Sequence, residues 1–211
     1  PESITPGVAN YYATTYIQDG DAVPIVVKVR DGRPIKIEGN ELSPLTKGGT
    51  SAQIQASVLD LYDVSKLKNP ILNGKGATWN QVDQWVKAEL NKVQSAGKKI
   101  RIVSSTVNSP STKSVIADFV AKYPNTKHIQ ADPISYTGII KANENSFGRA
   151  VLPRYHFDKA DVIVSFAADF LGTWISHVEF NRDYASNRNN ASLKNKKMSR
   201  HIQFEAGMSL T

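Results

Sequence analysis

Cysteine is absent from this chain of 211 residues, and its absence removes several kinds of chemistry. Without thiols the chain forms no disulfide, holds no iron–sulfur cluster and no thiolate metal site, and has no cysteine nucleophile. The absence leaves the redox compartment open, because proteins of either compartment can do without cysteine.

Long apolar runs are also missing. No stretch approaches the length of about 18 residues that a membrane-spanning helix needs, and no signal peptide is recognisable. The chain starts at Pro1 rather than Met, and its end, HIQFEAGMSLT, has the pattern of a strand and exit loop with no helix after it. We therefore expect that both ends were cut and that the chain is one piece of a longer polypeptide.

Glycine-rich phosphate loops are the third absence. The loops that follow the expected strands read SSTVNSPS (104–111), ADPISYTG (131–138), FAADFLGT (166–173) and EAGMSLT (205–211). None has the spacing G-x-G-x-x-G or G-x-x-x-x-G-K-[ST]. The segment KGGT at 47–50 has its lysine and glycines in the wrong order for a phosphate loop and predicts a plain loop.

The composition is that of a globular protein with a basic surface. The chain is 40% hydrophobic and 21% charged, and its net charge is +7, which fits one large or two small domains. The late basic residues predict either a solvated loop or a surface for an anionic partner. Aromatic residues do not alternate with them, so nucleic acid is not expected. These basic residues are Arg182, Arg188, Lys194, Lys196, Lys197 and Arg200.

The first third of the chain predicts a hairpin and two helices. Residues 24–38 alternate apolar and polar around Asp31-Gly32, which is typical of a tight turn between antiparallel strands. A helix with Ile54, Val58, Leu61 and Tyr62 at helical spacing is expected next. Thr78 and Gln81 have the spacing of a capping box at the start of a further helix. Its apolar stripe is Trp79, Val82, Val86, Leu90 and Val93, and Gly97 is placed to end it.

Strands and helices then alternate to the end of the chain. The expected strands are 100–105, 128–131, 161–166 and 201–206, and the expected helices begin near Ser109, Tyr136 and Thr173. This alternation predicts an α/β fold with a Rossmann-like parallel sheet, helices on both faces, and a small hairpin region ahead of it. The predicted domains are 1–62, the hairpin and helix region, and 63–211, the α/β domain.

The polar residues do not assemble into a recognisable active site. Of His128, His156, His177 and His201, two begin or precede strands, where a capping or core role is usual. His177 and Glu179 are two apart on a helix and point to different faces, so no metal site is expected. Ser146 in ENSFG lacks the first glycine of a nucleophile elbow, and Asp169 is placed to cap the helix that follows it.

Several phrases resemble a known family. VKVRDGRPIKIEGN, SPLTKGG and TWNQVDQWV look like the opening of molybdopterin oxidoreductases. PGVANYYATT, GGTSAQIQASVLDLYD, ANENSFG, ADVIVSFAADFLGTW and HIQFEAGMSLT extend the match over nearly all of the chain. Together they are similar to the B subunit of alternative complex III, a quinol-oxidising respiratory complex of bacteria.

The resemblance implies a fold without the usual cofactors. Catalytic relatives carry cluster cysteines ahead of the hairpin, where this chain reads NYYATTYIQDGDAVP. Their molybdenum ligand is expected near 131–148, where only Asp132, Ser135 and Ser146 are chemically possible substitutes. At the 166–174 corner, Phe170, Leu171 and Trp174 replace the glycines that would admit a pyrophosphate. We expect no catalytic, cofactor-binding or metal residue in this chain.

The function implied is that of a non-catalytic scaffold in a quinol:electron acceptor oxidoreductase. The resemblance implies iron–sulfur clusters in a separate domain, haem c in multihaem partner subunits, and quinol-binding membrane subunits on the periplasmic face of the cytoplasmic membrane. The alternative is a fragment of an active molybdopterin enzyme, and a basic binding module is a third candidate. The last strand, Ile202 to Ala206, is expected to be buried on both faces and, lacking a covering helix, to form a partner surface.

Overall fold

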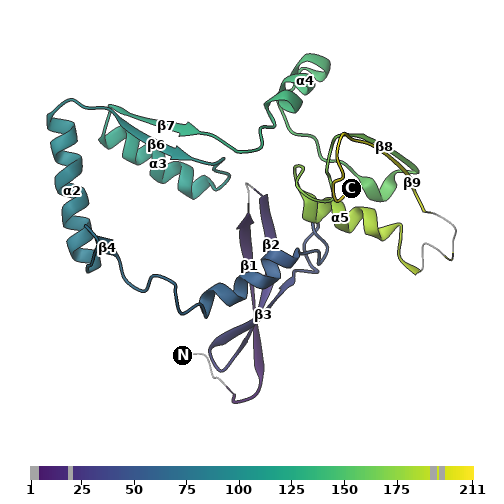
Figure 1. Ribbon diagram of the computed structural model, residues 1–211, viewed down its shortest axis with the longest axis horizontal. Coiled ribbons are helices and arrows are strands. Elements are labelled where there is room, and N and C mark those ends of the chain that lie inside the picture. Colours follow the sequence, from purple (N-terminus) through teal and green to yellow (C-terminus); the bar gives the residue numbers. More distant parts are fainter. Residues whose placement is uncertain (1–4, 19–20, 191–193, 195–197) are drawn as a thin grey trace. The chain divides into compact units, whose positions relative to one another are not determined.

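The chain folds into two compact units of mixed α/β structure. The computed structural model describes residues 5–18, 21–190, 194 and 198–211 (Figure 1). One unit contains residues 1–62 and 136–211, and the other contains residues 63–135. The predicted division into domains 1–62 and 63–211 stays a prediction. The compact units place residues 63–135 by themselves and group residues 136–211 with 1–62.

The first unit begins with a three-stranded antiparallel sheet. Strand β1 (Ala9–Gln18) pairs with β2 (Asp21–Arg30), and β2 pairs with β3 (Arg33–Gly39). Asp31 and Gly32 both have positive φ, 49° and 73°, as a two-residue turn between twisted strands requires. The predicted hairpin is confirmed. Strand β1 was not predicted, because the alternating pattern was found only in residues 24–38.

A short helical segment covers this sheet. Helix α1 (Ala52–Ala56) starts at Ser51, whose side chain accepts a hydrogen bond from the Ile54 N–H, and it tightens into the 3-10 helix η1 (Ser57–Leu61). Ile54 is fully buried. The first hydrophobic core contains Val23, Ile25, Ile37, Ile54 and Val178.

The remainder of the first unit is a parallel strand pair with helices. It consists of α4 (Thr137–Phe147), η2 (Phe157–Lys159), β8 (Val162–Phe166), α5 (His177–Ser186) and β9 (Arg200–Phe204). β8 and β9 pair in parallel. Val178 of α5 lies in the core of the hairpin sheet, so the last third of the chain is packed onto the first.

The second unit contains the other parallel pair. A small hairpin, β4 (Ile71–Leu72) and β5 (Lys75–Gly76), precedes α2 (Trp79–Ser95), β6 (Ile100–Ser104), α3 (Pro110–Lys122) and β7 (Thr126–Gln130). β6 and β7 pair in parallel, and Figure 1 shows α3 beside them and α2 at one end. The predicted capping box of α2 is confirmed, with Thr78 and Gln81 bonded to each other's backbone N–H.

Element positions agree well with the sequence, but burial does not. One parallel sheet covered on both faces was expected, whereas the described strands form two separate parallel pairs. Both have exposed apolar residues, among them Val103 (69% exposed) and Phe166 (71%). The last strand is not buried on both faces either, since Phe204 is 53% exposed. No residue of α2 is fully buried, because the helix stands at one end of the strand pair and does not pack across its face (Figure 1).

Two predicted helices are shorter than expected. The helix at 54–62 changes to 3-10 geometry at Ser57, whose hydroxyl donates to the Ile54 carbonyl oxygen. The helix expected from Thr173 begins only at His177, because Ile175 has a φ of 57° and interrupts helical geometry. None of the helices in the described part of the chain is both long and apolar enough to cross a membrane.

A close backbone approach fixes the end of the hairpin sheet and generates the first testable prediction. A Cβ built on Gly39 would lie 2.1 Å from the Gly48 carbonyl oxygen. Gly39→Ala should therefore lower the free energy of unfolding by roughly 1–3 kcal/mol, as overpacking typically does. The control is Gly76→Ala, since nothing lies within 4 Å of a Cβ at Gly76. Chemical denaturation of both variants measures the difference, and equal stability would show that the approach is not rigid.

Candidate functional site

The carboxyl ends of parallel strands are where α/β proteins usually bind ligands. In the second unit, those ends are the loops after β6 and β7. The Asp132 carboxylate accepts hydrogen bonds from the Thr106 N–H (2.7 Å) and the Thr106 hydroxyl (2.5 Å). The Gln130 side chain accepts from the Val107 N–H at 2.8 Å. The N–H groups of Thr106 and Val107, which could hold an anion, are thus occupied by side chains from the end of β7 and the loop after it.

The hydrogen bonds to Asp132 also change its acidity. The Thr106 hydroxyl, and after it the Thr106 N–H, hold the pKa of the Asp132 carboxyl below its usual range. The charged carboxylate is therefore the form that suits this loop, and it occupies the position of an anion rather than leaving it open.

The two serines considered as metal ligands lie on exposed surfaces. Ser135 is exposed in the loop before α4, and Ser146 is exposed on α4 itself. Helix α4 ends at Gly148 in a left-handed conformation (φ 69°), so ENSFG is a helix terminus rather than a strand-to-helix elbow. Ser135 and Ser146 belong to different compact units.

The corner after β8 is closed by its own residues. Asp169 caps it, because its carbonyl oxygen accepts from the N–H groups of Thr173 (3.0 Å) and Trp174 (2.9 Å). Its carboxylate accepts from the hydroxyls of Thr173 (3.2 Å) and Thr211 (3.0 Å), and Thr211 in turn accepts from the Leu171 N–H. Asp169 is therefore a turn residue with both oxygens engaged. The expectation that it caps the next helix is wrong, because α5 begins only at His177, with Ser176 in the N-cap position.

Aromatic side chains fill the space behind this corner. Phe170 is 1% exposed and stacks on Phe157 with ring centroids 4.3 Å apart. Leu171 and Trp174 pack against the same cluster and are partly buried. The predicted inward packing is confirmed for Phe170 and holds in part for Leu171 and Trp174. The second hydrophobic core comprises Phe157, Ile163, Phe170 and Phe180.

The histidines serve structural contacts or lie partly exposed. His128 lies 2.9 Å from the Ser104 hydroxyl, and His201 lies 3.1 Å from the Tyr184 hydroxyl. Burial, and after it the positive Arg188, lowers the pKa of His201. His177 and Glu179 do not act together, because buried Glu179 pairs with Arg154. A group that sequence spacing did not reveal is His156, Asp158 and Asp183, whose ligand atoms lie within 4.8 Å of one another.

Much of the late basic segment has a structural role. Arg182 donates to the Lys47 carbonyl oxygen, and Arg188 covers the Tyr184 ring at 3.4 Å and donates to Ser199. Lys194 is exposed, whereas Lys196 and Lys197 lie outside the described residues. An anionic partner for this segment stays a prediction.

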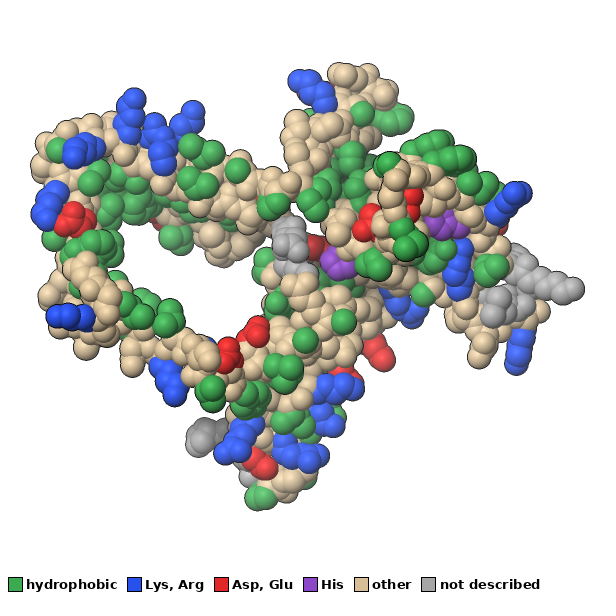
Figure 2. Space-filling model, viewed as in Figure 1, with side chains coloured by type: hydrophobic (Ala, Val, Ile, Leu, Met, Phe, Trp, Pro, Cys, Tyr) green, Lys and Arg blue, Asp and Glu red, His purple; other side chains and the backbone are tan. Residues whose placement is uncertain are grey.

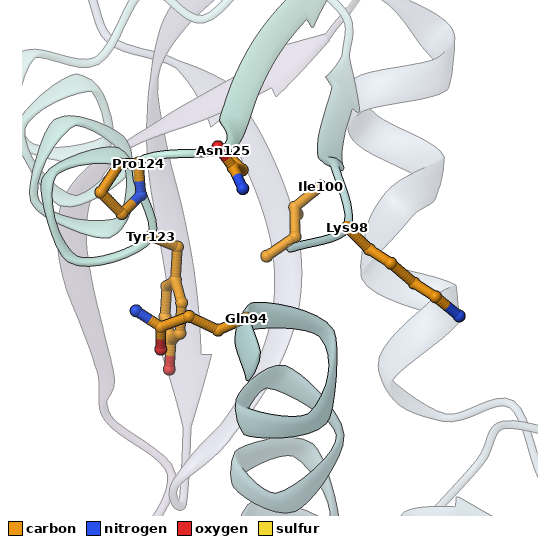
Figure 3. A pocket seen from close by; sticks show the side chains of 6 residues that line it. All are labelled: Gln94, Lys98, Ile100, Tyr123, Pro124 and Asn125. Carbon is orange, nitrogen blue, oxygen red and sulfur yellow. The ribbon is translucent and has the colours of Figure 1, made fainter. Parts of the chain in front are cut away.

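Two hollows of the described surface lie away from the carboxyl ends of the parallel strands. One, of about 130 Å³, is at the amino ends of β6 and β7 (Figure 3). Lys98, its one charged residue, points away from Gln94 and Tyr123 in that view. Another, of about 560 Å³, is open and lies beside β3 and the 39–50 turn. Neither combines an apolar enclosure with convergent polar groups, as ligand sites usually do.

A comparison with known proteins gives one informative likeness. No model of a known protein family matches the chain. Over 177 residues it is 23% identical to a protein of Nitratidesulfovibrio vulgaris named menaquinone reductase, molybdopterin-binding-like subunit. The match covers 80% of this chain but only 24% of that protein, so the chain spans about a quarter of its relative's length. The likeness supports a relationship to molybdopterin-type oxidoreductases.

The aromatic core generates a prediction about stability. Phe170→Ala should lower the free energy of unfolding by roughly 3–5 kcal/mol, because it removes a fully buried ring and leaves a cavity. Phe166→Ala, a change of the same size at a 71% exposed ring, is the matched control and should cost much less. Denaturant titration of both variants makes the comparison, and a similar loss for the two would mean that Phe170 does not close the corner.

The Asp132 loop generates a prediction about pH. A carboxyl whose pKa is lowered by folding stabilises the native state above its unfolded pKa, and the effect is lost as pH falls through the folded pKa. Thr106→Val removes the hydroxyl donor, so the pKa of Asp132 should rise toward its ordinary value in an NMR titration. Thr112→Val, a change at a residue of α3, is the control and should leave it unchanged. An unaltered pKa in Thr106→Val would contradict the hydrogen-bonded loop.

Proposed function

We propose that this chain is a non-catalytic, cofactor-free scaffold of a quinone-linked respiratory oxidoreductase. The observation that carries the proposal is the closed β8 corner. There Phe170 is buried in an aromatic core, and both carboxylate oxygens of Asp169 accept hydrogen bonds within the turn. The β6 loop adds a second obstacle, because Asp132 occupies the Thr106 N–H and Gln130 occupies the Val107 N–H.

The residues do not suit a molybdopterin or an iron–sulfur cluster. A pyrophosphate needs backbone N–H groups that a ligand can approach closely, usually through glycines. The N–H groups of Thr106, Val107 and Leu171 are instead bound to side chains. The chain also has no cysteine for a cluster. We therefore propose a Rossmann-like, molybdopterin-type body whose redox centres belong elsewhere, with iron–sulfur clusters in a further domain and haem c in partner subunits.

The proposed assembly follows from two similarities. The Nitratidesulfovibrio relative is named as a menaquinone reductase subunit, and the sequence resembles the B subunit of alternative complex III. Both concern electron exchange with a quinone pool, but the two names imply opposite directions of electron flow. We propose the quinol-oxidising direction, with membrane and multihaem subunits as partners and the periplasmic face of the cytoplasmic membrane as the location.

A scaffold contributes by holding redox centres at fixed separation. The well-packed junction between the hairpin sheet and α5 supports such a role, because it joins residues more than 130 positions apart through the Lys47–Asp183 contact. The exposed apolar faces of β8 and β9 also support it, since contiguous apolar surface commonly marks a partner contact. Figure 2 shows hydrophobic side chains gathered on the surface where Figure 1 places these strands.

The alternative is a working molybdopterin enzyme, and substitution separates the two. In the intact complex, Asp169→Asn and Ser146→Ala should leave quinol oxidation and the reverse menaquinone reduction within about twofold of wild type. A catalytic acid, base or ligand would cost far more, commonly 100-fold or greater. Complexes that assemble normally but lose turnover in either variant would establish an active site here.

The basic segment provides a separate test of assembly. Neutralising Lys194, Lys196 and Lys197 together should weaken association with an acidic neighbour without changing turnover per assembled complex, since exposed charges act through their summed field. Lys87, Lys98 and Lys99, neutralised together, control for net charge. Recovery of the complex at rising salt concentration measures the effect, and equal recovery for the two triple variants would exclude a specific role for the segment.

A further inference from the structure

The group formed by His156, Asp158 and Asp183 is the strongest candidate for a site that the proposed function does not use. Asp183 lies on α5, Asp158 lies in η2, and His156 immediately precedes η2. The Asn187 side chain donates to the Asp158 carbonyl oxygen at 2.8 Å, which fixes η2 to the end of α5. One ligand atom from each of the three residues lies within 4.8 Å of the other two.

The charges in this group do not balance. Lys47 Nζ lies 3.1 Å from Asp183 Oδ1 and 3.7 Å from Asp158 Oδ2. One ammonium therefore faces two carboxylates.

The carboxylate oxygens that Lys47 leaves over are buried and have no partner. Asp158 Oδ1 and Asp183 Oδ2 make no hydrogen bond within the described residues, and Asp183 is only 1% exposed. A buried, charged oxygen without a donor is costly. His156 Nδ1 is 3.8 Å from Asp158 Oδ1, too far for a hydrogen bond. The arrangement thus has unbalanced negative charge and unpartnered oxygens that a second cation would satisfy.

We propose that His156, Asp158 and Asp183 bind one divalent transition-metal cation, with Zn²⁺ the best match. Imidazole and carboxylate are both zinc ligands, at about 2.0–2.2 Å. Ligands at that distance lie roughly 3.3 Å apart in a tetrahedron. Since the three ligand atoms are up to 4.8 Å apart, the side chains must close by up to about 1.5 Å. His156 is 45% exposed in its side chain, which provides an entry path and leaves a coordination position to water.

Lys47 is the natural competitor for this metal. Its ammonium uses the same two carboxylates, so metal binding has to displace it or work against its charge. Removing the lysine should therefore strengthen metal binding, whereas removing any of the three ligands should weaken it. A simple ion pair without a metal site predicts neither effect.

The test is equilibrium dialysis of the intact, tag-free protein against Zn²⁺, with bound zinc counted per chain. His156→Gln should weaken binding at one site by about tenfold or more, and His177→Gln, a histidine outside the group, should not. Lys47→Gln should tighten that site by roughly 30-fold, the effect of removing one unit charge at about 4 Å from a divalent cation in a water-like medium. Mg²⁺ should compete poorly, since it prefers oxygen ligands.

The presence of the zinc site can be decided even if one of the variants folds badly. Asp183→Asn removes a buried partner of Lys47 and is therefore the variant whose folding is most at risk. The primary test uses His156, whose side chain lies at the surface. Equal zinc stoichiometry and affinity in wild type, His156→Gln and Lys47→Gln would overturn the site and leave a plain ion pair. The proposal would also be overturned if His156→Gln still bound Zn²⁺ and the site bound Mg²⁺ as tightly as Zn²⁺.

Discussion

The contact between the Lys47 turn and α5 is the constraint on which the larger unit depends. Lys47 Nζ pairs with buried Asp183, the Arg182 side chain donates to the Lys47 carbonyl oxygen, and Val178 enters the core of the hairpin sheet. A Cβ on Gly49 would meet the Thr46 carbonyl oxygen at 2.9 Å and the Arg182 side chain at 3.3 Å. The segment 47–50 is thus a packing surface for α5, and Lys47 neutralises part of the charge that the helix buries at Asp183.

Helix α5 connects the turn at residues 47–50 with the closed corner after β8. The same α5 contributes Phe180 to the aromatic core behind the β8 corner. On one side the helix is held by the hairpin sheet, and on the other it supports the residues that close the corner. A chain built this way fixes the spacing of distant segments, which is what a scaffold for electron-transfer partners requires. The closed corner and the rigid junction therefore belong to one physical account.

Local chemistry predicted most elements, and tertiary contacts decided the rest. The capping box at Thr78, the start of α3 at Ser109 and the Asp31-Gly32 turn depend on interactions within a few residues, and the structure has all three. The exposure of Phe166 and Phe204 could not be foreseen, because apolar composition does not reveal how many strands lie together. The grouping of His156, Asp158 and Asp183 is likewise invisible in sequence, since a separation of 25 residues lies between its two aspartates. The His-x-Asp spacing at 156–158 was the only local sign.

The central claim is that this fold holds no molybdopterin, and chemical analysis of the intact protein tests it most directly. Acid extraction releases bound pterin as a fluorescent derivative, and elemental analysis counts molybdenum in the same preparation. The account predicts neither pterin nor molybdenum above trace levels in preparations that are fully active with quinol. Stoichiometric molybdenum and pterin, lost together when the corner residue Phe170 is changed in a protein that remains folded, would contradict it.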